Sequence, residues 1–278
     1  MKTILITGAT SGIGLAAARQ LAAAGHRLVL VGRNPEKLST AVDLVRAAGA
    51  GAVDALRCDI GSTAAVRELA ETVRTNYPHL DVLANNAGGI QMRRSETEDG
   101  VETTFAVNHL GGFLLTELLI DLLLHSSPAR VLFTSSAMHF GSALELDDLN
   151  MRRGYNPAAA YGRAKLANIL YVRELSRRLE GTGVTANAFH PGVVATAIWD
   201  AAPWFARPAM AVGKKLFMIT PEQGGAALTY LATDPDVGAV SGCYFQRNRV
   251  KAPSRAAQND ESAHQLRRAC GELARLSG

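Results

Sequence analysis

The sequence is poor in cysteine and in histidine clusters, and these shortages exclude several kinds of site. Its 278 residues include three cysteines, Cys58, Cys243 and Cys270, which lie far apart and form no Cys-x-x-Cys pair. This spacing excludes a disulfide framework and a cysteine zinc site, and it fits a reducing compartment. The seven histidines show no spacing typical of metal ligands, so we expect no metal.

Strong charge and long hydrophobic runs are also missing. The formal net charge is +4 and the 29 Lys and Arg residues are scattered, so we expect no nucleic-acid partner. The longest apolar stretch, Phe113–Leu124, is interrupted by Glu117 and Asp121 and is too short to cross a bilayer. The N-terminus already has the pattern of a strand, which leaves no room for a signal peptide. We therefore expect a cytoplasmic protein without a membrane anchor.

The chain instead contains 47% hydrophobic residues, enough for a sizeable core, and no linker, repeat or low-complexity tract divides it. Apolar runs alternate with amphipathic stretches, which predicts one α/β domain over residues 1–278, with a doubly wound parallel sheet of about seven strands and helices on both faces. The expected strands are Thr3–Thr7, Arg27–Val31, Val53–Arg57, Val82–Ala84, Arg130–Thr134, Val184–Ala188 and Cys243–Phe245. The expected helices are Gly12–Ala24, Pro35–Ala48, Ser62–Tyr77, Asp99–Leu124, Pro157–Leu179 and Pro221–Thr233. Ligands of such sheets bind beyond the carboxyl ends of the strands.

A glycine turn follows the first expected strand. Gly8, Gly12 and Gly14 give the spacing G-x-x-x-G-x-G and lead into an Ala-rich helix. The start of a helix presents unpaired backbone N–H groups and partial positive charge, which suits a pyrophosphate. No Lys-Ser or Lys-Thr follows, so the turn is not a P-loop. The alternative is a glycine turn that binds nothing.

The residue after the second expected strand points to the type of dinucleotide. About 20 residues past a glycine turn, an Asp or Glu would bind the ribose of NAD, but this chain has Arg33 followed by Asn34. A guanidinium matches a 2′-phosphate in charge and shape. We therefore expect NADP(H), the alternative being a surface arginine that caps the strand.

Tyr161 and Lys165 stand four residues apart at the start of an expected long helix, and so share one helix face. An ammonium beside a phenol is expected to lower the tyrosine pKa from about 10, which would suit a general acid or base. Alone, a Tyr-x-x-x-Lys pair is common by chance in helices.

The order of motifs carries more weight than any one of them. Along the chain come Thr7-Gly8-Ala9-Thr10-Ser11-Gly12-Ile13-Gly14, Asn85-Asn86-Ala87-Gly88, Val107-Asn108-His109, Ser135-Ser136 and Tyr161-Gly162-Arg163-Ala164-Lys165. This order resembles the short-chain dehydrogenases/reductases, which implies a Rossmann-type fold and a bound nicotinamide dinucleotide.

The resemblance also implies roles for individual residues. Asn108, Ser136, Tyr161 and Lys165 would be catalytic: Tyr161 would transfer the proton, Ser136 would polarise the substrate oxygen, and Asn108 would hold a water linking Lys165 to solvent. Ser135 remains the alternative to Ser136. The implied cofactor-binding residues are Gly8, Thr10, Ser11, Gly12, Ile13, Gly14, Arg33, Asn34, Asp59, Ile60, Asn85, Ala87, Gly88, Asn108, Tyr161, Lys165, Pro191, Gly192, Val194 and Thr196. Asn85 is expected to bridge neighbouring backbones.

Within that family the chain resembles the retinol-dehydrogenase-like and carbonyl-reductase group. The Ser-Ser-Ala-Met-His run from Ser135 and the 25-residue separation of Ser136 from Tyr161 support this likeness. It implies mainly dinucleotide binding in residues 1–100, catalysis in 101–196, a substrate lid in 197–220 and a C-terminal helix in 260–276. It also implies a homodimer or homotetramer.

The expected activity is NADP(H)-dependent interconversion of an alcohol and a ketone or aldehyde. The aromatic lid, which holds both tryptophans, favours a bulky lipophilic carbonyl compound, the alternative being that these aromatics pack against the core or a partner subunit. Because cells keep NADPH reduced, we expect reduction. The alternatives are reduction of a conjugated carbon–carbon double bond and a non-catalytic dinucleotide sensor.

Overall fold

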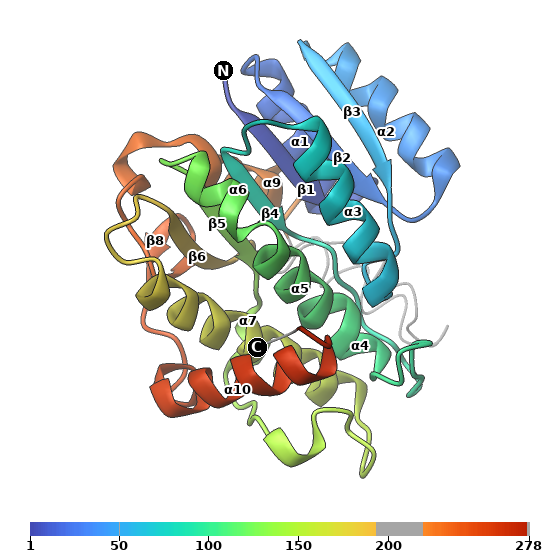
Figure 1. Cartoon of the computed structure of the whole chain (residues 1–278), viewed down its shortest axis with the longest axis vertical. Coiled ribbons are helices and arrows are strands. Elements are labelled where there is room, and N and C mark those ends of the chain that lie inside the picture. The colour runs from blue at the N-terminus through green and yellow to red at the C-terminus, as the bar shows by residue number, and fades with distance from the viewer. Residues whose placement is uncertain (50, 193–218, 277–278) are drawn as a thin grey trace.

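Eight strands in the described part of the chain form one sheet through the centre of the protein (Figure 1). The computed structural model describes residues 1–49, 51–192 and 219–276. The strands are β1 (Thr3–Thr7), β2 (Arg27–Gly32), β3 (Ala52–Arg57), β4 (Val82–Asn85), β5 (Arg130–Thr134), β6 (Thr185–His190), β7 (Tyr244–Gln246) and β8 (Arg249–Val250). Their order is β3-β2-β1-β4-β5-β6-β7-β8, and all pairings are parallel except that of β7 with β8. The doubly wound α/β fold is confirmed. The eighth strand was not expected, because it has two residues and no alternating pattern.

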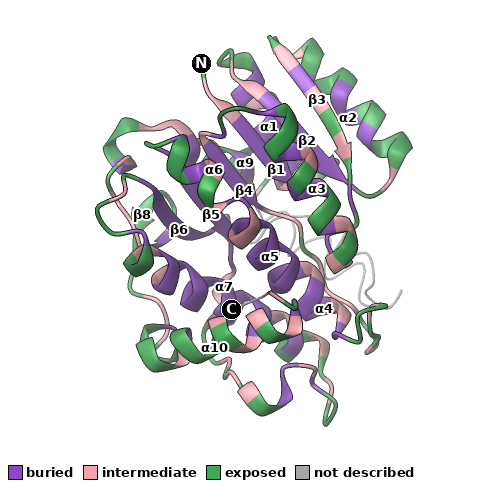
Figure 2. Ribbon diagram, in the orientation of Figure 1, coloured by how far each residue is buried: buried purple, intermediate pink, exposed green. Residues whose placement is uncertain are grey.

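Helices cover both faces of the sheet. They are α1 (Gly12–Ala23), α2 (Pro35–Ala47), α3 (Thr63–Asn76), α4 (Thr103–Phe105), α5 (Gly111–Leu118), α6 (Ile120–His125), α7 (Pro157–Arg178), α9 (Pro221–Thr233) and α10 (Asp260–Leu273). Successive strand residues point to opposite faces. Ile4 and Ile6 of β1 belong to the core beneath α1, α2 and α9, whereas Leu5 belongs to the core beneath α3, α5 and α7. The central strands are therefore buried on both sides (Figure 2), as is usual for parallel sheets.

The single helix expected over Asp99–Leu124 is wrong in detail. The helical region begins at Thr103, because the carboxylate of Glu102 accepts the N–H groups of Thr104 and Phe105. A π-helical turn follows at Ala106–Leu110. Leu119, with φ −102° and ψ 6°, then separates α5 from α6.

The C-terminal helix packs across α7, as Figure 1 shows in the lower part of the molecule. Arg173 and Arg177 of α7 both donate to Asp260, at 2.9 and 2.6 Å. Further along α10, the Arg267 guanidinium lies 3.6 Å from the carboxylate of Glu117, a partly buried residue of α5. The apolar side of α10 is buried in the core below α7. The final helix is thus an integral part of the domain.

Candidate functional site

A cavity of about 560 Å³ opens at the carboxyl ends of β1 to β5, where the sheet order reverses between β1 and β4. Its size is within the range of about 300–1,000 Å³ typical of ligand sites. Thirteen of the expected site residues line it: Gly8, Thr10, Ser11, Gly12, Ile13, Arg33, Asn34, Asp59, Ile60, Ala87, Gly88, Tyr161 and Lys165. One continuous cavity therefore joins the glycine turn to the Tyr-x-x-x-Lys pair.

The glycine turn brings β1 and α1 close to the loop after β4. Gly8 and Gly12 have φ values of +67° and +53°, which side chains with a Cβ rarely adopt. A Cβ on Gly8 would lie 2.8 Å from Cα of Ala87, and one on Gly14 would lie 2.3 Å from the Gly8 carbonyl oxygen. Gly14 does not line the cavity, so its missing side chain serves the packing of α1 on the turn.

The first turn of α1 faces this cavity with its backbone N–H groups uncapped. Ser11 precedes the helix in an extended conformation and its side chain makes no capping hydrogen bond. Because Gly12 and Ile13 line the cavity, these donors and the helix dipole suit an anionic group there. The site fits the pyrophosphate of a dinucleotide.

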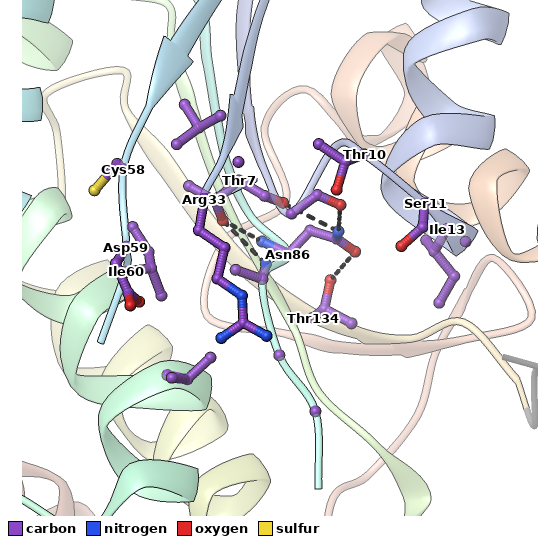
Figure 3. Close-up of a pocket in the computed structure, with 18 of the residues that line it drawn as sticks. Thr7, Thr10, Ser11, Ile13, Arg33, Cys58, Asp59, Ile60, Asn86 and Thr134 are labelled. Carbon is purple, nitrogen blue, oxygen red and sulfur yellow. Dashed lines mark hydrogen bonds between the residues drawn. The ribbon is translucent and has the colours of Figure 1, made fainter. Parts of the chain in front are cut away.

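Asn86 braces the centre of the cavity (Figure 3). Its Nδ2 donates to the carbonyl oxygens of Thr7 and Gly8, at 3.1 and 3.3 Å, and its Oδ1 accepts from Oγ1 of Thr134 at 3.1 Å. The hydroxyl of Thr7 in turn accepts the backbone N–H groups of Asn86 and Ala87. Asn86 therefore ties the ends of β1, β4 and β5 together.

The bridging expected of Asn85 is wrong, because Asn86 makes it instead. The side chain of Asn85 is buried on the α5 side of the sheet, where its Nδ2 donates to Oγ1 of Thr116 at 2.9 Å. Asn85 does not line the cavity. The period of two along a strand could have shown this, since Asn85 shares the face of Leu83, which packs toward α5.

Two basic side chains, those of Arg33 and Lys37, line the cavity. Arg33 is exposed and reaches between Asp59 and Asn86 (Figure 3). It makes no ion pair with a described residue. Lys37, in the first turn of α2, also lines the cavity, and it was missed although it lies four residues after Arg33. Asn34 caps α2 by accepting the Lys37 N–H at 2.8 Å, so its side-chain oxygen is already engaged.

The two serines after β5 face different ways. Ser135 is buried, and its hydroxyl donates to the Lys165 carbonyl at 2.8 Å. Ser136 accepts the Met138 N–H at 3.2 Å, and its hydroxyl lies near enough to the Tyr161 hydroxyl to act on the pKa of the tyrosine. Ser136 itself is absent from the cavity lining but lies beside Tyr161, which is part of it. Of the pair, only Ser136 has its hydroxyl directed toward the tyrosine.

The expected lowering of the Tyr161 pKa is not found. Burial raises the pKa of Tyr161 to about 12, although the hydrogen bond from Ser136 acts in the opposite direction. Burial also lowers the pKa of Lys165 to about 7, because its side chain is enclosed and no carboxylate of the described residues forms an ion pair with it. A lysine that is only partly charged at neutral pH cannot pull the tyrosine pKa down strongly.

Lys165 and Asn108 are held by backbone carbonyls. Nζ of Lys165 donates to the carbonyl of Thr134 at 3.0 Å. Nδ2 of Asn108 donates to the carbonyls of Gly89 and Thr104, and its Oδ1 accepts the Gly89 N–H. The Asn108 amide thus fixes the loop after β4 and does not line the cavity. A water relay through Asn108 stays a prediction.

The expected residues after β6 are only partly described. Pro191 and Gly192 follow the strand but do not line the cavity. Val194, Thr196 and residues 197–218 of the expected lid lie outside the described residues. Among the residues that the structure does describe, no group of His, Cys, Asp and Glu could hold a metal ion, and no helix is long and apolar enough to traverse a bilayer.

Comparison with known proteins agrees with this site. A sequence profile of short chain dehydrogenases matches residues 2–203. Retinol dehydrogenase 14 of Mus musculus is 42% identical over 257 residues, covering 88% of this chain and 77% of the mouse protein. Polyprenol dehydrogenase of Homo sapiens is 35% identical over 272 residues, covering 95% of this chain and 82% of the human protein.

A solved structure, the Pseudomonas aeruginosa RhlG/NADP active-site complex, has a TM-score of 0.72 and 26% sequence identity, covering 88% of this chain and 93% of that one. The span matched by the family profile contains the glycine turn, Ser136, Tyr161 and Lys165. The profile and the cavity therefore converge on the same part of the chain.

Proposed function

Since this chain belongs to the short chain dehydrogenase family, and within it to the retinol-dehydrogenase-like group, we propose that it reduces bulky lipophilic ketones or aldehydes with NADPH. Membership establishes an oxidoreductase that interconverts alcohols and carbonyl compounds. The cofactor, the direction and the substrate class are the parts we propose.

The observation that carries the proposal is the position of Tyr161 in the same cavity as the glycine turn. The bound dinucleotide would supply the hydride. Tyr161, with its pKa raised to about 12 by burial, keeps its proton at neutral pH and can give it to the oxygen of a carbonyl. A protonated phenol suits the general acid needed for reduction better than the base needed for oxidation.

Ser136 and Lys165 would assist Tyr161 from either side. The Ser136 hydroxyl lies beside the phenol, so it can hydrogen-bond the same substrate oxygen and polarise the carbonyl. Lys165 is buried behind the ring and has a pKa of about 7. It can therefore return a proton to Tyr161 after turnover without leaving the site.

The preference for NADP(H) rests on Arg33 and Lys37. Both line the cavity, no carboxylate stands at the position of Arg33, and a guanidinium with a nearby ammonium favours a phosphate ester over a free hydroxyl. The solved neighbour from Pseudomonas aeruginosa is an NADP complex, which supports the same choice.

A lipophilic substrate is supported by the relatives, since the mouse protein is a retinol dehydrogenase and the human one a polyprenol dehydrogenase. Both names denote long apolar alcohols. We place such a chain beside Tyr161, whose side chain lines the cavity.

The deciding experiment is a panel of carbonyl compounds, namely hexanal, 4-nitrobenzaldehyde, all-trans-retinal and a bulky aromatic ketone, assayed with NADPH and with NADH. We expect higher kcat/KM with NADPH and with the larger apolar carbonyls. Mass spectrometry of the products separates carbonyl reduction from reduction of a conjugated double bond. A protein that binds NADPH and reduces none of these compounds would contradict the proposal.

A further inference from the structure

His139 is a fully buried histidine just beyond the proposed catalytic serine. It ends the short 3-10 helix Ala137–His139, which Ser136 caps by accepting the Met138 N–H. Its ring packs against two aromatic rings, with centroid distances of 4.1 Å to Phe140 and 4.8 Å to Tyr244. These contacts leave the imidazole little freedom to rotate.

Both ring nitrogens of His139 have backbone partners. Nδ1 lies 2.6 Å from the carbonyl oxygen of Ser136, and Nε2 lies 3.1 Å from the backbone nitrogen of Ser254. A carbonyl oxygen only accepts and an amide N–H only donates. The proton must therefore be on Nδ1, with Nε2 as acceptor. Burial also lowers the pKa of His139, which keeps the ring in this neutral form.

The turn around His139 packs against the helix that carries the reacting tyrosine. On one side, the turn from Met138 to Ser142 packs against Gly162, the neighbour of Tyr161: a Cβ there would lie 2.7 Å from the Met138 carbonyl oxygen. On the other side, Ser254 belongs to the segment that connects β8 to α10. His139 is the link between these two sides.

We propose that His139 is a positioning residue, which fixes Ser136 beside Tyr161 through its Nδ1–H and anchors that turn to the C-terminal segment through Nε2. The inference rests on the proposed function, because it acts through the hydroxyl of Ser136. It gives a role to the histidine of the Ser-Ser-Ala-Met-His run, which the proposed proton transfer does not use.

Three substitutions separate the two hydrogen bonds. In His139→Asn the side-chain amide nitrogen can replace Nδ1 and keep the bond to Ser136, whereas in His139→Gln the terminal oxygen can replace Nε2 and keep the bond to Ser254. His139→Phe preserves an aromatic ring and loses both bonds. Steady-state reduction is measured with NADPH and the carbonyl of the panel that the wild type reduces with the highest kcat/KM, together with Tm and NADPH affinity.

We expect His139→Asn to lose at most about threefold in kcat and His139→Gln and His139→Phe to lose about tenfold, because one hydrogen bond that orients the serine is worth about 1.4 kcal/mol. The KM for NADPH should stay within about twofold in all three, since His139 is not among the residues that line the cavity. A merely structural histidine would instead make kcat follow Tm, so equal loss in the Asn and Gln variants would overturn the proposal.

An activity-independent measurement tests the same geometry. Long-range proton–nitrogen NMR of the full chain distinguishes the two neutral imidazole tautomers, and the His139 signals are those missing in His139→Asn. We expect the Nδ1–H form; an Nε2–H or charged ring would overturn the proposal even if the wild type proved inactive. If the wild type reduces no carbonyl of the panel, only the proposed function is contradicted. If Tyr161→Phe is inactive but His139→Asn and His139→Gln lose the same factor in kcat, only the present inference is contradicted.

Discussion

Nζ of Lys165 lies 5.2 Å from the centre of the Tyr161 ring, one helical turn away on α7. Both side chains are held in the less charged state by burial, which raises the pKa of Tyr161 to about 12 and lowers that of Lys165 to about 7. The unliganded site therefore keeps a phenol that can donate a proton and an amine that can exchange one. This arrangement is the basis of the first two predictions.

Replacing Tyr161 by Phe should reduce kcat for carbonyl reduction by about 10²- to 10⁴-fold, the usual contribution of a general acid. The ring remains, so the packing of α7 and the affinity for NADPH should change little. Stopped-flow or steady-state assays give kcat, and quenching or enhancement of NADPH fluorescence gives the Kd. The matched control is Ser135→Ala, which also removes a nearby hydroxyl, but one that is not directed toward Tyr161. Substantial turnover by Tyr161→Phe would refute the proposed mechanism.

Lys165→Met should abolish turnover yet raise the thermal stability of the unliganded protein near neutral pH. The pKa of Lys165 is lower in the folded protein than in the unfolded chain, so folding releases a proton between about pH 7 and pH 10.5. The resulting penalty is fully present below pH 7 and disappears as the pH rises toward 10.5. We expect Tm to increase by about 3 °C at pH 7, equivalent to about 1 kcal/mol in a domain of this size, and by less at pH 10.

The control for this pH dependence is Lys37→Met, which removes an exposed ammonium from the same cavity. Its effect on Tm should be small and nearly independent of pH. A Lys165→Met protein that is less stable than the wild type at pH 7 would show that the hydrogen bond to the Thr134 carbonyl outweighs the cost of burying the amine.

The sequence predicts the regular elements well because their signals are local. The bounds of β1, β5 and α9 agree with the structure, since apolar runs, prolines at helix starts and glycine turns act over a few residues. The π-helical turn at Ala106–Leu110 was missed, because it depends on tertiary contacts: Gly111 lies so near the end of β3 that a Cβ would be 2.0 Å from the carbonyl oxygen of Ile60.

The site was predicted less completely than the fold, and for a different reason. Motif order located the cavity residues along the chain, but it could not tell which of two adjacent polar side chains faces the cavity. The alternation of side chains in β4 settles this for Asn85 and Asn86. Burial of Tyr161 and Lys165 depends on residues from several elements, so the direction of the tyrosine pKa could not be read from their spacing.

Replacing Arg33 by Ala should weaken NADPH binding by about 10- to 100-fold, the range expected for losing charge-assisted hydrogen bonds to a phosphate. The affinity for NADH should stay within about twofold, because Arg33 makes no ion pair with the described residues that its loss would disrupt. Isothermal titration with both dinucleotides measures the change. Arg19→Ala, an exposed arginine of α1 outside the cavity lining, should affect neither. Equal weakening of both cofactors would reject the assignment of a 2′-phosphate to Arg33.

Asn86 and Asn85 offer a matched pair for the last prediction, since they are adjacent, both engaged in hydrogen bonds, and turned to different sides of β4. Asn86→Ala removes the links to Thr7, Gly8 and Thr134, so the strand ends that shape the cavity lose their common brace. We expect about tenfold weaker binding of NADPH and NADH alike. Without the brace, the strand ends must become ordered when the cofactor binds, which costs about 1.4 kcal/mol of binding free energy. Asn85→Ala removes only the bond to Thr116 of α5; it should lower Tm while leaving both affinities within about twofold. If Asn85→Ala weakened cofactor binding as much as Asn86→Ala, the brace would extend through β4 to α5 rather than ending at the cavity wall.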